Sequence, residues 1–80
     1  MDIRSAQLFL HLASSLNYSK TAEQLYVSPS TLTRIVQRLE DEVGVALLTR
    51  DKRSVRLTPA GTRFAQFAKQ YLENWHQLLI

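Results

Sequence analysis

The sequence predicts a mainly α-helical fold, in which three helices are followed by a short two-stranded hairpin and a long last helix. Three observations predict it. Apolar residues recur at spacings of three and four along most of the chain. This spacing changes after Gly44, and two short runs of strand character follow at residues 46–50 and 54–58. Only two glycines and two prolines occur, and they lie where helices are expected to begin or end.

Length and composition place the chain among small folded proteins of a reducing compartment. Its 80 residues form one domain, near the lower size limit for folding without disulfides or metals. There is no cysteine, which suits the cytoplasm. No apolar run approaches the roughly 18 residues of a membrane span, and the first residues lack the pattern of a secretory signal. We expect a cytoplasmic protein that does not enter membranes.

The first helix is expected over about residues 3–15. Its apolar side chains include Leu8 and Leu12, which are spaced to share one helical face. Asp2 precedes it as an N-cap. Asn17 closes it, since asparagine tolerates left-handed backbone geometry.

Two further helices follow in series. The second begins at Ser19 as N-cap, and it ends by Ser28 because Pro29 disfavours helical geometry in the residue before it. Ser28 and Pro29 suit the N-cap and first turn of a third helix. This helix runs to about Val43 and stops at Gly44. Helices of about eight and fifteen residues around a short turn have helix-turn-helix dimensions.

A charged hairpin is expected directly after the helix-turn-helix. Residues 46–50 and 54–58 have strand character, and the second run alternates apolar and polar side chains. They flank the tip Asp51-Lys52-Arg53. A hairpin in this position is typical of a wing, so the predicted body is a winged helix-turn-helix.

The last helix is expected from Pro59 onward, with Thr58 as its N-cap. Four of the seven aromatic residues lie on its apolar stripe. A stripe about 20 residues long is more than so small a body can cover, so we expect it to pack on a second copy. The residues assigned to this dimer contact are Phe64, Phe67, Ala68, Tyr71, Leu72, Trp75, Leu78 and Leu79.

The charge distribution favours an anionic partner. The net charge is +3, and four of the ten Lys and Arg residues lie within residues 50–56, whereas three acids lie together at residues 40–42. This asymmetry indicates a basic edge that meets phosphate. The acids are taken as solvated surface, and His11 and His76 have no cysteine or acid at ligand spacing. We therefore expect no metal, cofactor or enzymatic activity.

Several ordered motifs resemble the DNA-binding region of LysR-type transcriptional regulators. They begin with Phe9, cover essentially the whole chain, and comprise AEQLYVSPSTLTR at residues 22–34, QRLE at 37–40, EVG at 42–44, LL at 47–48, Arg50 and LTPAG at 57–61. The resemblance implies a winged helix-turn-helix at residues 1–58 and a linker and dimerisation helix at residues 59–80.

Family members usually continue into a ligand-sensing domain. We expect this chain to be the DNA-binding fragment, with any small-molecule inducer acting only through that missing domain. Within the family, residues 28–32 look most like activators of branched-chain amino-acid biosynthesis genes.

The start of the third helix is the expected base-reading surface. Ser30, Thr31 and Thr33 can bond base edges, and Arg34 can pair with guanine through two hydrogen bonds. Many family members have glutamine where this chain has Pro29, which offers only apolar contact, such as to a thymine methyl group. The alternative is that the serines cap the helix and the other residues are solvated.

Contacts with the DNA backbone are expected from three segments. They are assigned to Ser19, Lys20 and Thr21 at the start of the second helix, Arg38 on the third, and Arg50 and Lys52 beside the wing. The family resemblance places Arg53 in or over the minor groove. The alternatives are capping by Ser19, an ion pair between Arg38 and Glu42, and a merely solvated wing.

Two functions therefore compete. The first is sequence-specific binding of duplex DNA by a homodimer, which implies an inverted-repeat operator. The second is a helical protein-interaction module that dimerises through residues 59–80, with an incidental basic wing.

Overall fold

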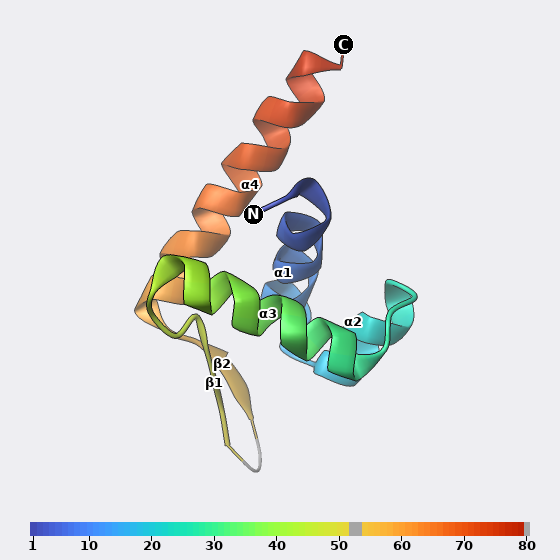
Figure 1. Ribbon diagram of the computed structural model, residues 1–80, viewed down its shortest axis with the longest axis vertical. Helices are drawn as coiled ribbons and strands as arrows, with labels where there is room; N and C mark the ends of the chain where they lie inside the picture. Colours follow the sequence, from blue (N-terminus) through green and yellow to red (C-terminus); the bar gives the residue numbers. More distant parts are fainter. Residues whose placement is uncertain (52–53, 80) are drawn as a thin grey trace.

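The computed structural model describes residues 1–51 and 54–79. Within these residues the order is α1 (Ile3–Ser15), α2 (Tyr18–Gln24), α3 (Pro29–Val43), β1 (Leu48–Arg50), β2 (Val55–Leu57) and α4 (Pro59–Leu78) (Figure 1). This arrangement confirms the mainly α-helical, winged helix-turn-helix fold. No helix in the described ranges is long and apolar enough to cross a membrane.

Three of the four helices begin at the predicted N-caps. The backbone amide of Ser5 donates to Asp2 Oδ1 at 2.7 Å, and that of Thr31 donates to Ser28 Oγ at 3.0 Å. The amide of Gly61 donates to Thr58 Oγ1 at 2.9 Å. Each bond satisfies an amide that the helix itself leaves without a partner.

The boundary between α1 and α2 differs from the prediction. Leu16, with a φ of 54°, takes the left-handed conformation that ends α1. Asn17 instead caps α2, because its Oδ1 accepts the Lys20 amide at 2.9 Å. Ser19 therefore lies inside α2, whose first helical residue is Tyr18. Asparagine is as good an N-cap as serine, so α2 can begin two residues earlier than predicted.

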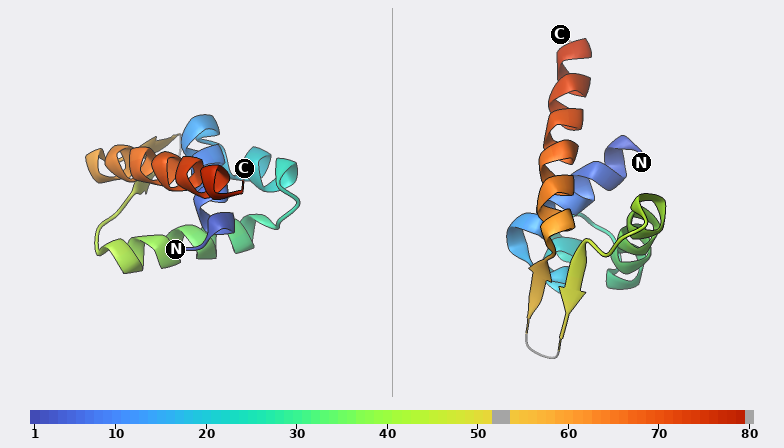
Figure 2. Two further views of the ribbon diagram at one scale, coloured as in Figure 1. Left: turned by 90° about the horizontal axis from the view of Figure 1, so that it is seen from above. Right: turned by 90° about the vertical axis from the view of Figure 1, so that its left-hand side faces the viewer.

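The core lies where α1 meets α2, α3 and the first half of α4. Its buried side chains are Leu8, Phe9, Leu12, Ala22, Leu32, Val36, Leu39, Leu47 and Leu48. Phe64 of α4 meets Phe9 of α1 edge to face, with ring centroids 5.0 Å apart. The far half of α4 extends beyond this body, at the end opposite the hairpin (Figures 1 and 2).

The wing is an antiparallel pair of three-residue strands: β1 begins two residues later than predicted, and β2 is one residue shorter at each end. Leu48 pairs with Leu57, and Arg50 pairs with Val55. Thr58 continues the connection by donating from its backbone amide to the Leu47 carbonyl at 3.0 Å. The tip residues assigned to DNA, Lys52 and Arg53, lie outside the described ranges.

Candidate nucleic-acid interface

The first turns of α3 carry a connected row of hydroxyl groups. Ser28 Oγ donates to Thr31 Oγ1 at 2.8 Å and lies 3.1 Å from Ser30 Oγ. Thr33 Oγ1 donates to the Pro29 carbonyl at 3.0 Å. Most of the predicted base readers are thus already bonded within the helix, so they present a fixed polar surface rather than independently rotating groups.

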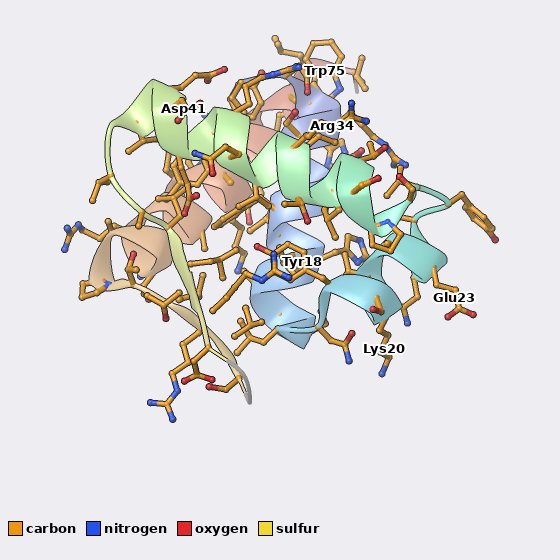
Figure 3. All side chains as sticks on the ribbon, turned by 60° about the horizontal axis from the view of Figure 1, so that its bottom comes forward. Tyr18, Lys20, Glu23, Arg34, Asp41 and Trp75 are labelled. Atoms are coloured by element: carbon orange, nitrogen blue, oxygen red, sulfur yellow. The ribbon has the colours of Figure 1, made fainter. Side chains whose placement is uncertain are left out.

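Exposure separates the predicted base readers into two groups. Pro29, Ser30, Thr33 and Arg34 are exposed, whereas Thr31 is half-buried. Arg34 lies along the edge of α3 away from Tyr18, as Figure 3 shows. These exposed residues all lie in the N-terminal half of α3, the part of such a helix that enters a major groove.

Arg50 is held against α2 by an aromatic ring. Its guanidinium lies 4.3 Å from the centroid of the Tyr18 ring, a cation–π contact that joins the wing to the start of α2. Burial raises the pKa of Tyr18, while the charge of Arg50 opposes that rise and Glu40 adds to it. Arg50 itself is exposed, so this contact presents its charge at a fixed place.

The three residues predicted to contact the DNA backbone from α2 do not share one environment. Ser19 and Lys20 are exposed, and Figure 3 shows Lys20 at the outer edge of α2. Thr21 is 0% exposed, and its Oγ1 lies 2.6 Å from Ser15 Oγ. The Thr21 prediction is therefore wrong: the side chain ties α2 to α1 inside the protein and has no surface for phosphate.

Arg38 does not form the alternative ion pair. Among the described residues, Glu42 pairs with the N-terminal amino group of Met1 at 3.1 Å, and no pair with Arg38 occurs. Arg38 is exposed on α3, one turn beyond Arg34. Its guanidinium can therefore meet phosphate along the same edge of the helix.

Glu40 is a positioning residue that the sequence did not indicate. Its Oε2 accepts the backbone amides of Leu47 and Leu48, at 2.7 and 3.2 Å. These bonds fix the start of the wing to α3, so Glu40 is not the merely solvated acid that was predicted. No local motif distinguishes it, because both amides lie seven or eight residues away.

The turn between α2 and α3 has its own anchor. Arg4 Nη2 donates to the Leu25 carbonyl at 2.8 Å, which ties this turn to the start of α1. The next residue, Tyr26, has a φ of 58° and a side chain that is 95% exposed. The turn is therefore fixed through its backbone, without burial of its aromatic residue.

The predicted dimer stripe divides along α4. Ala68 is buried and Phe64 is half-buried against Phe9, so these two belong to the core of one chain. Tyr71 and Leu72 are half-buried. The side chains left exposed are Phe67, Trp75, Leu78 and Leu79. These four side chains are the most accessible part of the stripe to a second copy.

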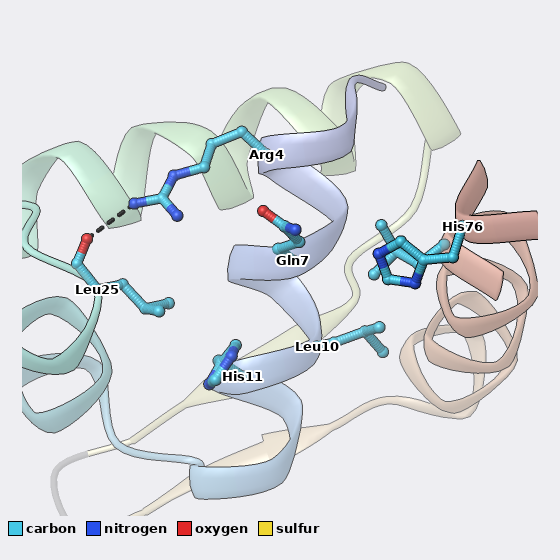
Figure 4. Close-up of a pocket in the computed structure, with 7 residues that line it drawn as sticks. Arg4, Gln7, Leu10, His11, Leu25 and His76 are labelled. Atoms are coloured by element: carbon cyan, nitrogen blue, oxygen red, sulfur yellow. Dashed lines mark hydrogen bonds between the residues drawn. The ribbon is translucent and has the colours of Figure 1, made fainter. Parts of the chain in front are cut away.

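A shallow groove of about 360 Å³ separates α1 from the outer half of α4 (Figure 4). His11 and His76 both line it, together with Arg4, Leu25 and Leu72. No group of three or more His, Cys, Asp or Glu residues in the described ranges could hold a metal ion.

This chain is similar in sequence to a known family and to several known proteins. The family described as bacterial regulatory helix-turn-helix protein, lysR family, matches residues 3–62. The HTH-type transcriptional activator IlvY of Haemophilus influenzae is 51% identical over 77 residues, which are 96% of this chain and 26% of that protein. The HTH-type transcriptional regulator IlvY of Escherichia coli is 47% identical over 78 residues, 98% and 26% respectively. The chain spans about a quarter of these relatives.

Solved structures share the whole fold. The CbnR_DBD–DNA complex superposes with a TM-score of 0.91 at 36% identity, covering 96% of this chain and 88% of that one. The BenM_DBD complex with catB site 1 DNA gives 0.90 at 34% identity, covering 99% and 85%.

Proposed function

The chain belongs to the LysR family of bacterial regulatory helix-turn-helix proteins, and from this membership we propose that it binds duplex DNA sequence-specifically as a homodimer. In this proposal α3 enters the major groove and the wing reaches the minor groove. Two-fold symmetry places the two recognition helices about one DNA turn (~34 Å) apart, or a multiple of that, on an inverted repeat.

The observation that carries the proposal is the fixed polar surface at the start of α3. Exposed Ser30, Thr33 and Arg34 offer acceptors and donors for base edges, and exposed Pro29 adds an apolar face. Arg50, held over the Tyr18 ring, offers a charge for phosphate from the wing. The DNA complexes of the similar CbnR and BenM domains support the same use here.

The regulated genes and the inducer belong to the same proposal. The identity to proteins named IlvY agrees with the resemblance of residues 28–32 to activators of branched-chain amino-acid biosynthesis genes. A small-molecule inducer would act through a separate domain, since the chain covers about a quarter of those relatives.

Salt dependence tests DNA binding. If phosphate contacts dominate, log affinity falls linearly with log salt, by about 0.9 for each phosphate neutralised. R53A is expected to flatten this slope by roughly one unit, whereas R34A should relax the preference at one base pair. Selection of bound duplexes from a random pool, repeated with each variant, measures both effects. An affinity that changes neither with salt nor with either substitution would contradict the proposal. It would favour the alternative function, a protein-interaction module.

A further inference from the structure

The N-cap residue of α3 and two side chains of the helix form a continuous chain of hydrogen bonds along one face. Ser28, Thr31 and Arg34 are each three residues apart, so they follow one another at successive turns. Ser28 Oγ donates to Thr31 Oγ1 at 2.8 Å, and Arg34 Nη2 donates to the same Thr31 oxygen at 3.2 Å. The hydroxyl of Thr31 therefore stands between the helix cap and the arginine.

The first member of this chain is fixed more firmly than the others. Ser28 Oγ also accepts the backbone amide of Thr31 at 3.0 Å, so its position is set by the N-cap geometry. With the hydrogen of Ser28 directed at Thr31, the Thr31 oxygen accepts two bonds and uses both of its lone pairs. Thr31 is half-buried, which restricts its rotamers, whereas Arg34 is exposed.

We propose that Thr31 is a positioning residue whose hydroxyl aims the guanidinium of Arg34 at the base pair that Arg34 reads. This inference rests on the proposed DNA-binding function. It changes the role predicted for Thr31 from direct base contact to control of its neighbour. The bond from Arg34 to the residue three positions earlier draws the guanidinium toward the N-terminus of α3, the end that enters the major groove.

The chemistry of arginine allows both bonds at once. A guanidinium has five N–H donors in a planar fork, and the bond to Thr31 uses one of the two on Nη2. The remaining donors suffice for a bidentate pair with O6 and N7 of guanine. A free arginine loses much rotamer freedom when it binds a base, and the tether to Thr31 removes part of that loss in advance.

The test uses valine and serine at position 31. T31V keeps the β-branched shape and the capped backbone amide but removes the hydroxyl, whereas T31S keeps the hydroxyl. The operator comes first from pool selection with the unaltered 80-residue chain. R34A then locates the base pair that Arg34 reads. Affinity for the operator and for the duplex changed at that base pair gives the discrimination of each variant.

T31V is expected to reduce this discrimination by about 2- to 10-fold, the effect of one hydrogen bond. T31S should restore it, and T31V combined with R34A should lose nothing beyond R34A alone. Preference at other base pairs, salt slope and melting temperature should stay unchanged. T62V provides the matched control, because it removes an exposed threonine hydroxyl on α4, outside the predicted base-reading surface. It should retain preference at the Arg34 base pair.

Three results would overturn the proposal. T31V could keep full discrimination, it could lose preference at a base pair other than the one R34A affects, or R34A could alter no base pair. If T31V does not fold, T31A tests the same loss of the Thr31 hydroxyl. Failure of DNA binding itself is distinct, since the unaltered chain would then enrich no sequence from the pool.

Discussion

Tyr26 has a backbone conformation that side chains disfavour. Its φ of 58° is left-handed, and its ring, 95% exposed, gains almost nothing from burial. Y26G should therefore stabilise the fold by about 1 kcal/mol. Y26A is the control, because it removes the ring but keeps the disfavoured geometry, and it should change stability by less than about 0.5 kcal/mol. Urea unfolding of the three proteins measures this, and equal effects of both variants would refute it.

Ionisation of Tyr18 makes the free energy of unfolding depend on pH in the alkaline range. Burial raises its pKa, so the unfolded chain loses the phenolic proton at a lower pH than the folded chain. This contribution is fully present below the unfolded value of about 10 and is lost as pH rises through the folded pKa. The free energy of unfolding should fall more steeply above pH ~10 in the unaltered chain than in Y18F. Parallel curves for the two proteins would count against a buried phenol.

The roles of several single residues could be predicted from the sequence, and those of others could not. Asp2, Ser28 and Thr58 were recognised as caps because a cap acts on amides two or three residues away. Thr21 was misassigned because a hydroxyl in the first turn of a helix looks the same whether it faces solvent or a neighbouring helix. Its partner, Ser15, lies on α1, and only the angle between the two helices brings them together.

At the scale of elements, Glu40 joins the recognition helix to the wing. E40A would leave the amides of Leu47 and Leu48 without their acceptor, so we expect a loss of about 2 kcal/mol in unfolding free energy. DNA affinity should fall as well, because the wing would no longer be held to α3. D41A is the matched control: Asp41 is exposed and bonds only Gln37 among the described contacts. Equal effects of the two variants would contradict the positioning role.

The elements themselves were largely predictable. Helix periodicity, the two prolines and Gly44 fixed the helix ends to within a residue or two, since those signals are local. How the elements join was not predictable. Gly61 illustrates this, because a Cβ there would overlap the Leu47 carbonyl oxygen. The close approach of α4 to Leu47, just before β1, is a long-range contact with no pattern in the sequence.

For the whole molecule, we expect the exposed end of α4 to determine assembly. Trp75 is 41% exposed and Leu78 is 79% exposed, although both lie on the stripe whose first half covers α1. W75E should give a monomer with much weaker operator binding, because it places a charge in the apolar contact. Q66E carries the same charge change to an exposed position off the stripe and should remain dimeric. Sedimentation measures both, and a dimeric W75E would exclude this face as the interface.

The sequence predicts the apolar stripe of α4, but not which part of it is packed in the core and which part is exposed. Periodicity identifies which side chains share a face, and it placed Phe64 and Trp75 on the same one. It does not say how far a neighbouring helix reaches. The buried and half-buried residues of the stripe end at Leu72, so most of its first part serves the core while the part beyond Leu72 is open.

The close packing at Gly61 fixes the direction in which the open face of α4 points relative to the rest of the domain. No glycine or proline interrupts the helix after Gly61, so a rotation at one end is transmitted to the other. One alanine inserted after Ala68 would turn the open face by about 100°. It should abolish paired binding to an inverted repeat while single half-sites are still bound. Seven inserted residues would bring the face back to within about 20°, restoring the dimer with a new half-site spacing. Pool selection would report that spacing, and an unchanged spacing would show that α4 does not set it.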